Sequence, residues 1–239
     1  MQIPRFAFEK FPGSQPVLTT QMKSVGEAMA MGRTFQESFQ KALRSLETGH
    51  YGWGCEKVKE LDWDWEKLKY NLRVPNPDRM TALYAALKRG MSEHELYELT
   101  FIDPWFLSQL GELLEVEKFL SETTLNQLTK EDLYEVKRRG FSDRQIAYST
   151  ASTEKDVRAH RISLGIVPTF KRVDTCAAEF EAHTPYMYSS YEEECEASPN
   201  NKKKVLILGG GPNRIGQGIE FDYCCCHACF ALQVTYCAC

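Results

Sequence analysis

Apolar and polar positions recur at helical spacing most clearly between residues 77 and 165. This stretch repeats itself at an offset of fifty residues, because Gly90 and Gly140 each follow two basic residues at the end of an apolar run. A serine two residues later opens the next helix in each copy, with a glutamate or glutamine three positions on. The sequence therefore predicts two similar helix–turn–helix units, with capping boxes formed by Ser92 with Glu95 and by Ser142 with Gln145.

Three more helices are predicted around these units. One covers residues 34–49 and begins with a capping box of Thr34 and Glu37. A longer helix between the two units begins with Asp103 as its N-cap, followed by a proline at the first helical position. The last helix covers residues 153–165. The predicted fold class is therefore mainly α.

The flanks of the helical region lack this periodicity. Alternating apolar and polar residues predict a half-buried strand over residues 5–11, and a second strand is predicted over residues 24–32. The tryptophans of the stretch 50–75 are predicted to anchor a connection on the core, with a carbohydrate or peptide surface as the alternative. Residues 166–201 have the composition of a loop that ends in an acidic linker, for which a metal site is the weaker alternative.

An apolar, β-branched run at residues 204–208 leads directly into glycines and then into a helix-like segment, as at the start of a nucleotide-type α/β domain. Two known loop templates fail here. The dinucleotide fingerprint needs a third glycine where Arg214 stands, and the P-loop needs lysine and serine or threonine where Gln217 and Gly218 stand. The residues that still suit an anion, through open backbone N–H groups and one cation, are Gly209, Gly210, Gly211, Arg214 and Gly216.

The chain ends sixteen residues after Tyr223. A parallel sheet cannot be built from one strand and one helix, so we expect the strand at 204–208 to lack its neighbour and to leave an exposed apolar patch. Six of the nine cysteines fall in this terminal stretch, which does not fit a secreted disulfide framework and indicates a reducing, intracellular protein. Zinc binding by these cysteines is an alternative, although the usual paired spacing is missing.

Composition and charge argue against several classes of function. The formal net charge of −4 disfavours nucleic acid as the main partner, although the helix–turn–helix outline alone suggests DNA binding. The acidic residues that follow Ser92 disfavour DNA as well. No apolar run is long enough to cross a bilayer, so no membrane partner is expected. The helical region contains no set of residues that predicts catalysis or metal binding.

Five segments resemble the large chain of the carbamoyl-phosphate synthase family, and they occur in the family's order. They are Ile3–Phe6, Leu18–Glu27, Arg172–Phe180, Tyr186–Ser189 and Val205–Cys225. Together they extend over nearly the whole chain, and the last looks like the start of the second half of that large chain. The tryptophan-rich segment 51–79 and the cysteine triplet Cys224–Cys226 are most similar to plant versions, which implies the plastid stroma, or the cytoplasm if the protein is not from a plant.

The resemblance implies a fragment of an ATP-dependent ligase that makes carbamoyl phosphate from bicarbonate, ATP and ammonia, for arginine and pyrimidine biosynthesis. In that family a helical oligomerisation domain joins two ATP-grasp halves. By resemblance, residues 1–49 are the β/α tail of the first ATP-grasp domain and residues 50–199 are the oligomerisation domain. Residues 200–239 are then the first strand, loop and helix of a Rossmann-like pre-ATP-grasp domain.

The resemblance also implies which functional parts are present. Gly218 and Glu220 match positions that line the family's internal tunnel for carbamate, although a glycine also suits tight strand–helix packing. Most contacts of the family to ATP and to Mg²⁺ or Mn²⁺ lie outside this span, so we expect no tight binding of either and no synthesis activity. The expected partners are the small glutaminase subunit and other copies of the large chain. A non-catalytic helical scaffold is the alternative function.

Overall fold

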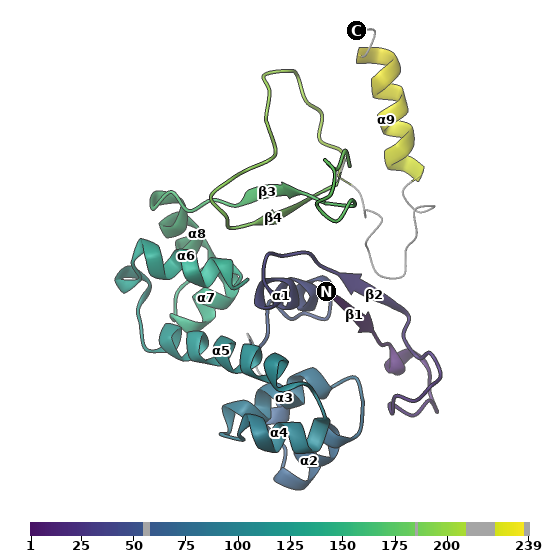
Figure 1. Ribbon diagram of the computed structural model, residues 1–239, viewed down its shortest axis with the longest axis vertical. Coiled ribbons are helices and arrows are strands. Elements are labelled where there is room, and N and C mark those ends of the chain that lie inside the picture. Colours follow the sequence, from purple (N-terminus) through teal and green to yellow (C-terminus); the bar gives the residue numbers. More distant parts are fainter. Residues whose placement is uncertain (55–57, 185, 209–222, 237–239) are drawn as a thin grey trace.

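The computed structural model describes residues 1–54, 58–184, 186–208 and 223–236, with the last three residues described by their backbone alone. Its helices include α1 (Phe35–Ser45), α2 (Trp65–Arg73), α3 (Arg79–Lys88), α4 (Glu93–Thr100), α5 (Pro104–Ser121), α6 (Lys130–Arg138), α7 (Asp143–Ser149), α8 (Glu154–Ser163) and α9 (Tyr223–Tyr236), with 3-10 turns at Phe8–Lys10, Lys59–Asp62 and Leu125–Gln127. We call α2–α8 together the helical unit. In Figure 1, α5 runs through its middle, between α2–α4 and α6–α8. The mainly helical fold class is confirmed.

Two small antiparallel sheets accompany the helices. β1 (Gln2–Arg5) pairs with β2 (Gly26–Met29), and β3 (Thr169–Arg172) pairs with β4 (Met187–Ser190). Both sheets lie next to α1, the β3–β4 sheet above it in the view of Figure 1. α9 stands apart from the helical unit in the same view.

The predicted helical repeat is confirmed. Gly90 follows α3 with a φ of 89°, and Gly140 follows α6 with a φ of 87°, a left-handed backbone that glycine adopts without strain. Ser92 and Glu95 form the predicted capping box at the start of α4. Asp103 caps α5, and the helix predicted over residues 153–165 is present as α8.

Two of the predicted capping boxes form only in part. Thr34 and Ser142 accept hydrogen bonds from the backbone N–H groups of Glu37 and Gln145, as predicted. The side chains of those partners point elsewhere. Glu37 accepts from the N–H of Arg33 at 2.7 Å, and Gln145 turns inward toward α1. Both side chains are used in contacts that hold neighbouring segments together, which a local capping rule does not foresee.

The core lies between α1 and the helices of the helical unit. Its largest wholly buried apolar side chains are Phe141, Leu68, Leu72, Leu83, Leu96, Leu107, Leu120, Leu133, Ile146 and Val157. Trp53 is buried and its Nε1 donates to the carbonyl of Met80 at 2.9 Å, which confirms that it anchors its connection. The same prediction is wrong for Trp65, which is 41% exposed. This ring lies on the outer side of α2, where the guanidinium of Arg89 stacks 3.9 Å from its centroid.

The strand predicted over residues 5–11 is wrong in its position. β1 ends at Arg5, and Phe8–Lys10 forms a 3-10 turn. The alternation in this segment reflects a turn that stacks the rings of Phe6 and Phe8, whose centroids are 5.8 Å apart. The second predicted strand is confirmed as β2.

The β3–β4 sheet lies in a stretch that the sequence predicts as loop. Its inward side chains are polar, since Lys171 and Ser190 are buried. Phe170 and Met187 instead point outward, each 42% exposed. The usual apolar-in, polar-out alternation of a strand is therefore inverted here, and the pattern gives no strand signal.

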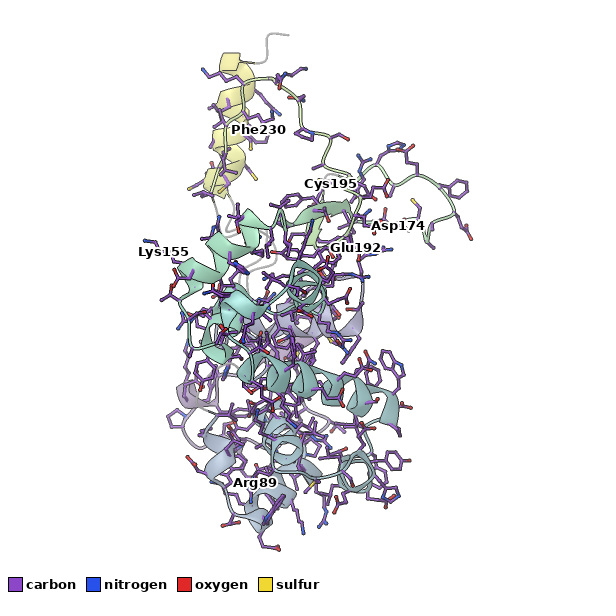
Figure 2. All side chains as sticks on the ribbon, turned by 90° about the vertical axis from the view of Figure 1, so that its left-hand side faces the viewer. Arg89, Lys155, Asp174, Glu192, Cys195 and Phe230 are labelled. Atoms are coloured by element: carbon purple, nitrogen blue, oxygen red, sulfur yellow. The ribbon has the colours of Figure 1, made fainter. Side chains whose placement is uncertain are left out.

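Residues 204–208 do not form the predicted strand. Val205, Leu206 and Leu208 are 56%, 83% and 86% exposed and have no regular secondary structure. A strand obtains its hydrogen bonds from a neighbour, and the described residues provide none at this position. These apolar side chains are exposed, as expected for the strand, and Phe230 on α9, clear of the helical unit in Figure 2, is also 59% exposed. The domain boundaries after residues 49 and 199 stay predictions.

Candidate functional site

The site residues singled out from the sequence lie outside the described part of the chain. They are Gly209, Gly210, Gly211, Arg214, Gly216, Gly218 and Glu220. An anion-binding loop and a tunnel lining therefore stay predictions for these positions. The described residues form other features that the sequence did not indicate: a cavity, a buried ion cluster, a network of glutamines and an exposed aromatic surface.

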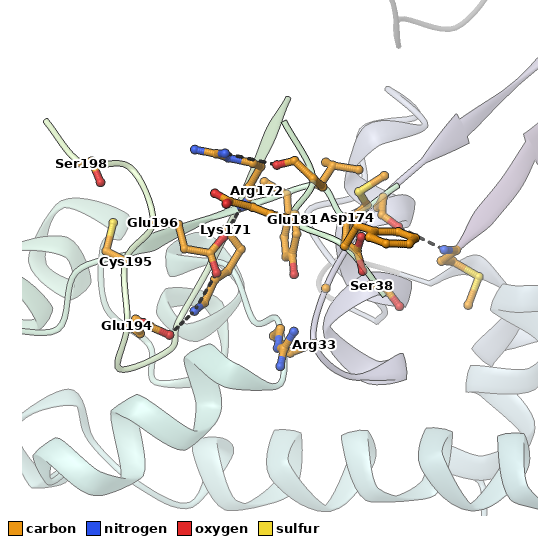
Figure 3. A pocket seen from close by; sticks show the side chains of 18 residues that line it. Arg33, Ser38, Lys171, Arg172, Asp174, Glu181, Glu194, Cys195, Glu196 and Ser198 are labelled. Carbon is orange, nitrogen blue, oxygen red and sulfur yellow. Dashed lines mark hydrogen bonds and ion pairs between the residues drawn. The ribbon is translucent and has the colours of Figure 1, made fainter. Parts of the chain in front are cut away.

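A cavity of about 880 Å³ opens between the start of α1 and the β3–β4 sheet (Figure 3). One wall consists of residues 30–33 and Ser38, and the other includes residues 171–174 and 194–196. Charged side chains of both signs line it. Lys171 Nζ lies 3.3 Å from Glu194 Oε2 and 3.5 Å from Glu196 Oε1, so its charge is already matched within the wall.

Backbone hydrogen bonds lower the pKa of two side chains in this wall, Glu196 and Cys195. Glu196 Oε2 accepts from the N–H of Arg172 at 2.7 Å, and this hydrogen bond is the main cause that lowers the pKa of Glu196. Cys195 Sγ accepts from the N–H of Phe170 at 3.4 Å. Backbone hydrogen bonds from Ala197 and Phe170 lower the pKa of the Cys195 thiol, which is exposed at the cavity.

We expect Cys195 to react faster with iodoacetamide in the folded chain than in the denatured chain at neutral pH, by roughly threefold. The reason is that a larger thiolate fraction outweighs the smaller loss of intrinsic nucleophilicity. Site-resolved mass spectrometry of short reactions measures the two rates, with Cys195→Ser as the control for assignment. Equal rates in the two states would contradict the effect of the backbone hydrogen bonds.

A buried ion cluster, made of Lys137, Asp143, Arg161 and Tyr191, ties the segment after β4 to the helical unit. Asp143 at the start of α7 accepts from Lys137 Nζ at 2.9 Å and pairs with Arg161 Nη2 at 3.0 Å. The Tyr191 ring covers both cations, with its centroid 5.0 Å from Lys137 Nζ and 5.7 Å from Arg161 Cζ. The side chains of the two cations are only 6% and 7% exposed.

Burial governs the ionisation of this cluster. It lowers the pKa of Lys137 to about 8, against the opposing attraction of Asp143. Burial alone would raise the pKa of Asp143, but Lys137 and Arg161 together lower it. Burial raises the pKa of Tyr191, which is therefore neutral near pH 7. Arg44 of α1 also faces the cluster, and its Nη1 donates to the carbonyl of Gly140 at 2.6 Å.

A glutamine network joins α1 to the second helix–turn–helix unit. Gln40 Oε1 accepts from the N–H of Trp53 at 3.2 Å and from Gln145 Nε2 at 3.0 Å. Gln40 Nε2 donates to the carbonyl of Arg139 at 3.2 Å. The buried side-chain amide of Gln40 thus forms hydrogen bonds with Trp53, Arg139 and Gln145. These bonds fix the position of α1 against α7.

Two separate groups of aromatic rings flank the α4–α5 turn, and we call their five members together the aromatic surface: Tyr97 with Phe101, and Phe35 with Trp105 and Phe106. The ring centroids of Tyr97 and Phe101 are 6.0 Å apart, and those of Trp105 and Phe106 are 5.0 Å apart. Phe35 of α1 meets the second pair at 5.6 and 5.2 Å. Phe101 is 77% exposed and Trp105 is 54% exposed.

No three histidine, cysteine or acidic side chains of the described residues lie close enough to hold a metal ion. Cys237 and Cys239 lie outside these residues, so zinc binding at the C-terminal cysteines stays a prediction. None of the described helices is both long and apolar enough to cross a membrane.

Two family models match the chain. The one described as carbamoyl-phosphate synthetase large chain, oligomerisation domain, matches residues 27–165, and the one described as carbamoyl phosphate synthase preATP-grasp domain matches residues 201–237. The chain is also 76% identical over 232 residues to "Carbamoyl phosphate synthase arginine-specific large chain, chloroplastic" of Arabidopsis thaliana. The chain belongs to the carbamoyl phosphate synthase large-chain family. This confirms the resemblance found in the sequence.

The match to the Arabidopsis large chain covers 97% of this chain and 20% of that protein. The large chains of Oryza sativa, also named chloroplastic and arginine-specific, and of Nostoc are 74% and 68% identical over the same share of this chain. This chain therefore spans about a fifth of the length of these carbamoyl phosphate synthase relatives. The oligomerisation-domain match includes α1–α8, the whole aromatic surface and most of the ion cluster.

Proposed function

We propose that this chain acts within the large chain of a carbamoyl phosphate synthase, as the helical piece through which copies of the large chain associate. One observation carries the proposal: α1–α8 pack around a common core over the residues matched by the oligomerisation domain. A plastid location in a plant is supported by the names of the two plant relatives, which call them chloroplastic.

The activity of the whole protein belongs to the same proposal. The parent large chain takes ammonia from a small glutaminase subunit and, with ATP and bicarbonate, makes carbamoyl phosphate for arginine and pyrimidine biosynthesis. Two ATP-grasp halves hold ATP with Mg²⁺ or Mn²⁺, because phosphoryl transfer needs a bridging metal and cationic clamps. This chain alone lacks most of those groups and is inactive.

The residues after 200 supply part of the carbamate tunnel in this proposal. Gly218 and Glu220 line it, and residues 209–216 form an anion-handling loop at its side. The support is the preATP-grasp match over residues 201–237, which contains all of these positions. A non-catalytic scaffold is the second candidate, favoured by the common helical core of α1–α8.

The purified chain, supplied with ATP, bicarbonate and ammonia, is expected to form no carbamoyl phosphate, whereas a full-length relative serves as the positive control. Sedimentation velocity over about a hundredfold range of concentration is expected to show association. Turnover by this chain alone would contradict the proposed division of labour. A monomer at every concentration would contradict its role in association.

A further inference from the structure

The β3–β4 sheet is attached to the rest of the protein with very little apolar contact. Among the described residues of the stretch 167–200, no apolar side chain is buried, and the buried side chains are those of Lys171 and Ser190. Tyr191, directly after β4, is the one member of this stretch that packs against the core of the helices. The cavity of about 880 Å³ separates the sheet from the start of α1 (Figure 3). The sheet therefore keeps its place through polar contacts and a single ring.

Two polar contacts involve the residues on either side of Tyr191. Lys41 Nζ of α1 donates to the carbonyl of Ser189, and Arg138 Nη2 of α6 lies 4.0 Å from Glu192 Oε1. The Arg138 side chain is 41% exposed, so solvent weakens its ion pair. The partly buried ring of Tyr191 is therefore the contact most sensitive to the charges beneath it.

The charges around the Tyr191 ring are unbalanced. The charged groups that act on Lys137 or on this ring, from α1, α6, α7 and α8, are Arg44, Lys137, Asp143, Arg158 and Arg161. Asp143 is the one carboxylate of this set, and it is shared by two of the cations. Arginine keeps its charge at every ordinary pH, so Lys137 is the cation of the set that can become neutral. Loss of its proton brings the set closer to charge balance.

Docking of the Tyr191 ring is coupled to the proton on Lys137. With the ring in place the Lys137 side chain is 6% exposed, and burial lowers its pKa to about 8. A lifted ring lets water reach the ammonium group, so the pKa returns toward the usual value of lysine. Deprotonation removes the cation–π contact of Lys137, whereas Arg161 keeps its contact with the ring. The docked state thus binds fewer protons, and docking strengthens as pH rises through 8.

We propose that Tyr191 and the ion cluster form a latch that holds the β3–β4 sheet on the helical unit and closes more firmly when Lys137 loses its proton. The chain runs from this sheet into residues 201–237, the part that matches the preATP-grasp domain. The latch therefore controls how rigidly that part is joined to the helices. That role within the large chain rests on the proposed function, whereas the latch itself involves only residues of this chain.

Hydrogen exchange of the full 239-residue chain tests the latch, measured by mass spectrometry on peptides that contain Thr169–Arg172 and Met187–Ser190. An isolated two-stranded sheet is marginally stable in water, so its amides exchange once the sheet lifts. Each rate is divided by the intrinsic exchange rate at the same pH. The resulting protection of the β3–β4 amides is expected to rise about fivefold to tenfold between pH 7 and pH 9. The β1–β2 sheet is the internal control and is expected to show no such rise.

Two variants separate the effect of the proton from that of the ring. Lys137→Met keeps a side chain of similar length without the proton, and its β3–β4 protection is expected to stay high and to change no further with pH. Tyr191→Leu removes the ring and is expected to give low protection at every pH. The wild-type profile decides even if a variant does not fold.

A flat or falling β3–β4 profile in the wild-type chain would overturn the latch, and so would an equal rise in β1–β2 or a rise that persists in Lys137→Met. Sedimentation velocity on the same samples keeps the two proposals apart. A monomeric chain that shows the rise contradicts only the proposed association. An associating chain with a flat profile contradicts only the latch.

Discussion

Replacing Asp143 by alanine is expected to lower the free energy of unfolding by about 3–5 kcal/mol. The carboxylate is the counter-charge shared by Lys137 and Arg161, whose side chains are 6% and 7% exposed. Without it, two buried cations face each other beneath the Tyr191 ring, and no nearby group of the cluster compensates them. Urea unfolding followed by far-UV circular dichroism measures the loss.

Glu135→Ala is the matched control for Asp143→Ala. Glu135 pairs with Arg138 at 3.0 Å, the same distance as the buried pair, but both side chains are about half exposed. Solvent screens such a pair, so the expected loss is at most about 0.5 kcal/mol. If the two variants lose the same stability, the ion cluster does not hold the fold together.

The same cluster predicts how stability changes with pH. Asp143 has a lowered pKa in the folded chain, so its contribution to the free energy of unfolding is present above its ordinary pKa and is lost as pH falls through the folded value.

Lys137 behaves differently, because burial lowers its pKa to about 8 while the unfolded chain keeps this lysine protonated to a much higher pH. Between pH 8 and about 9.5 the unfolded state binds more protons, so stability is expected to rise with pH. Lys137→Met is expected to remove that rise.

Gly140→Ala is expected to destabilise the chain by about 3 kcal/mol, well beyond Gly90→Ala at about 1 kcal/mol. The two glycines end equivalent helices with nearly the same φ, 87° and 89°, so the backbone strain of alanine is shared. They differ in their surroundings. A Cβ at Gly140 would lie 2.8 Å from Glu37 Cα and 3.0 Å from its carbonyl oxygen, whereas a Cβ at Gly90 meets nothing within 4 Å.

Differential scanning calorimetry measures the melting temperatures of Gly140→Ala and Gly90→Ala. Because the two glycines hold equivalent positions in the helical repeat, each variant serves as the reference for the other. Equal melting temperatures for Gly140→Ala and Gly90→Ala would contradict the tight packing of α1 against the second helix–turn–helix unit. A clearly larger drop for Gly140→Ala than for Gly90→Ala would show that only one of the two similar turns carries a long-range contact.

The helices were predictable because their signals are local. Asp103 caps the turn that it precedes, and the capping box of Ser92 with Glu95 is completed within one turn of helix. The β3–β4 sheet was missed because its buried positions are polar: Lys171 is held by acidic residues more than twenty positions away. Local pattern rules cannot see a partner that only the folded chain supplies.

The candidate site was predictable from the sequence only in part. The match to the oligomerisation domain was predictable from resemblance, but no spacing rule links Gln40 with Gln145, which meet across 105 residues. The aromatic surface was missed because Trp105 and Phe106 fit the apolar stripe of a buried helix, and only the packing shows which side of α5 stays open. The tunnel and loop residues stay predictions, since they lie outside the described part of the chain.

The long reach of the glutamine network has a consequence for synthesis on the ribosome. α1 leaves the exit tunnel before the helix that supplies Gln145, which is 105 residues further along. At typical elongation speeds this delay is about 5–20 s, during which the buried amide of Gln40 lacks its Gln145 partner. Docking of α1 is therefore completed only late in synthesis, when α7 emerges.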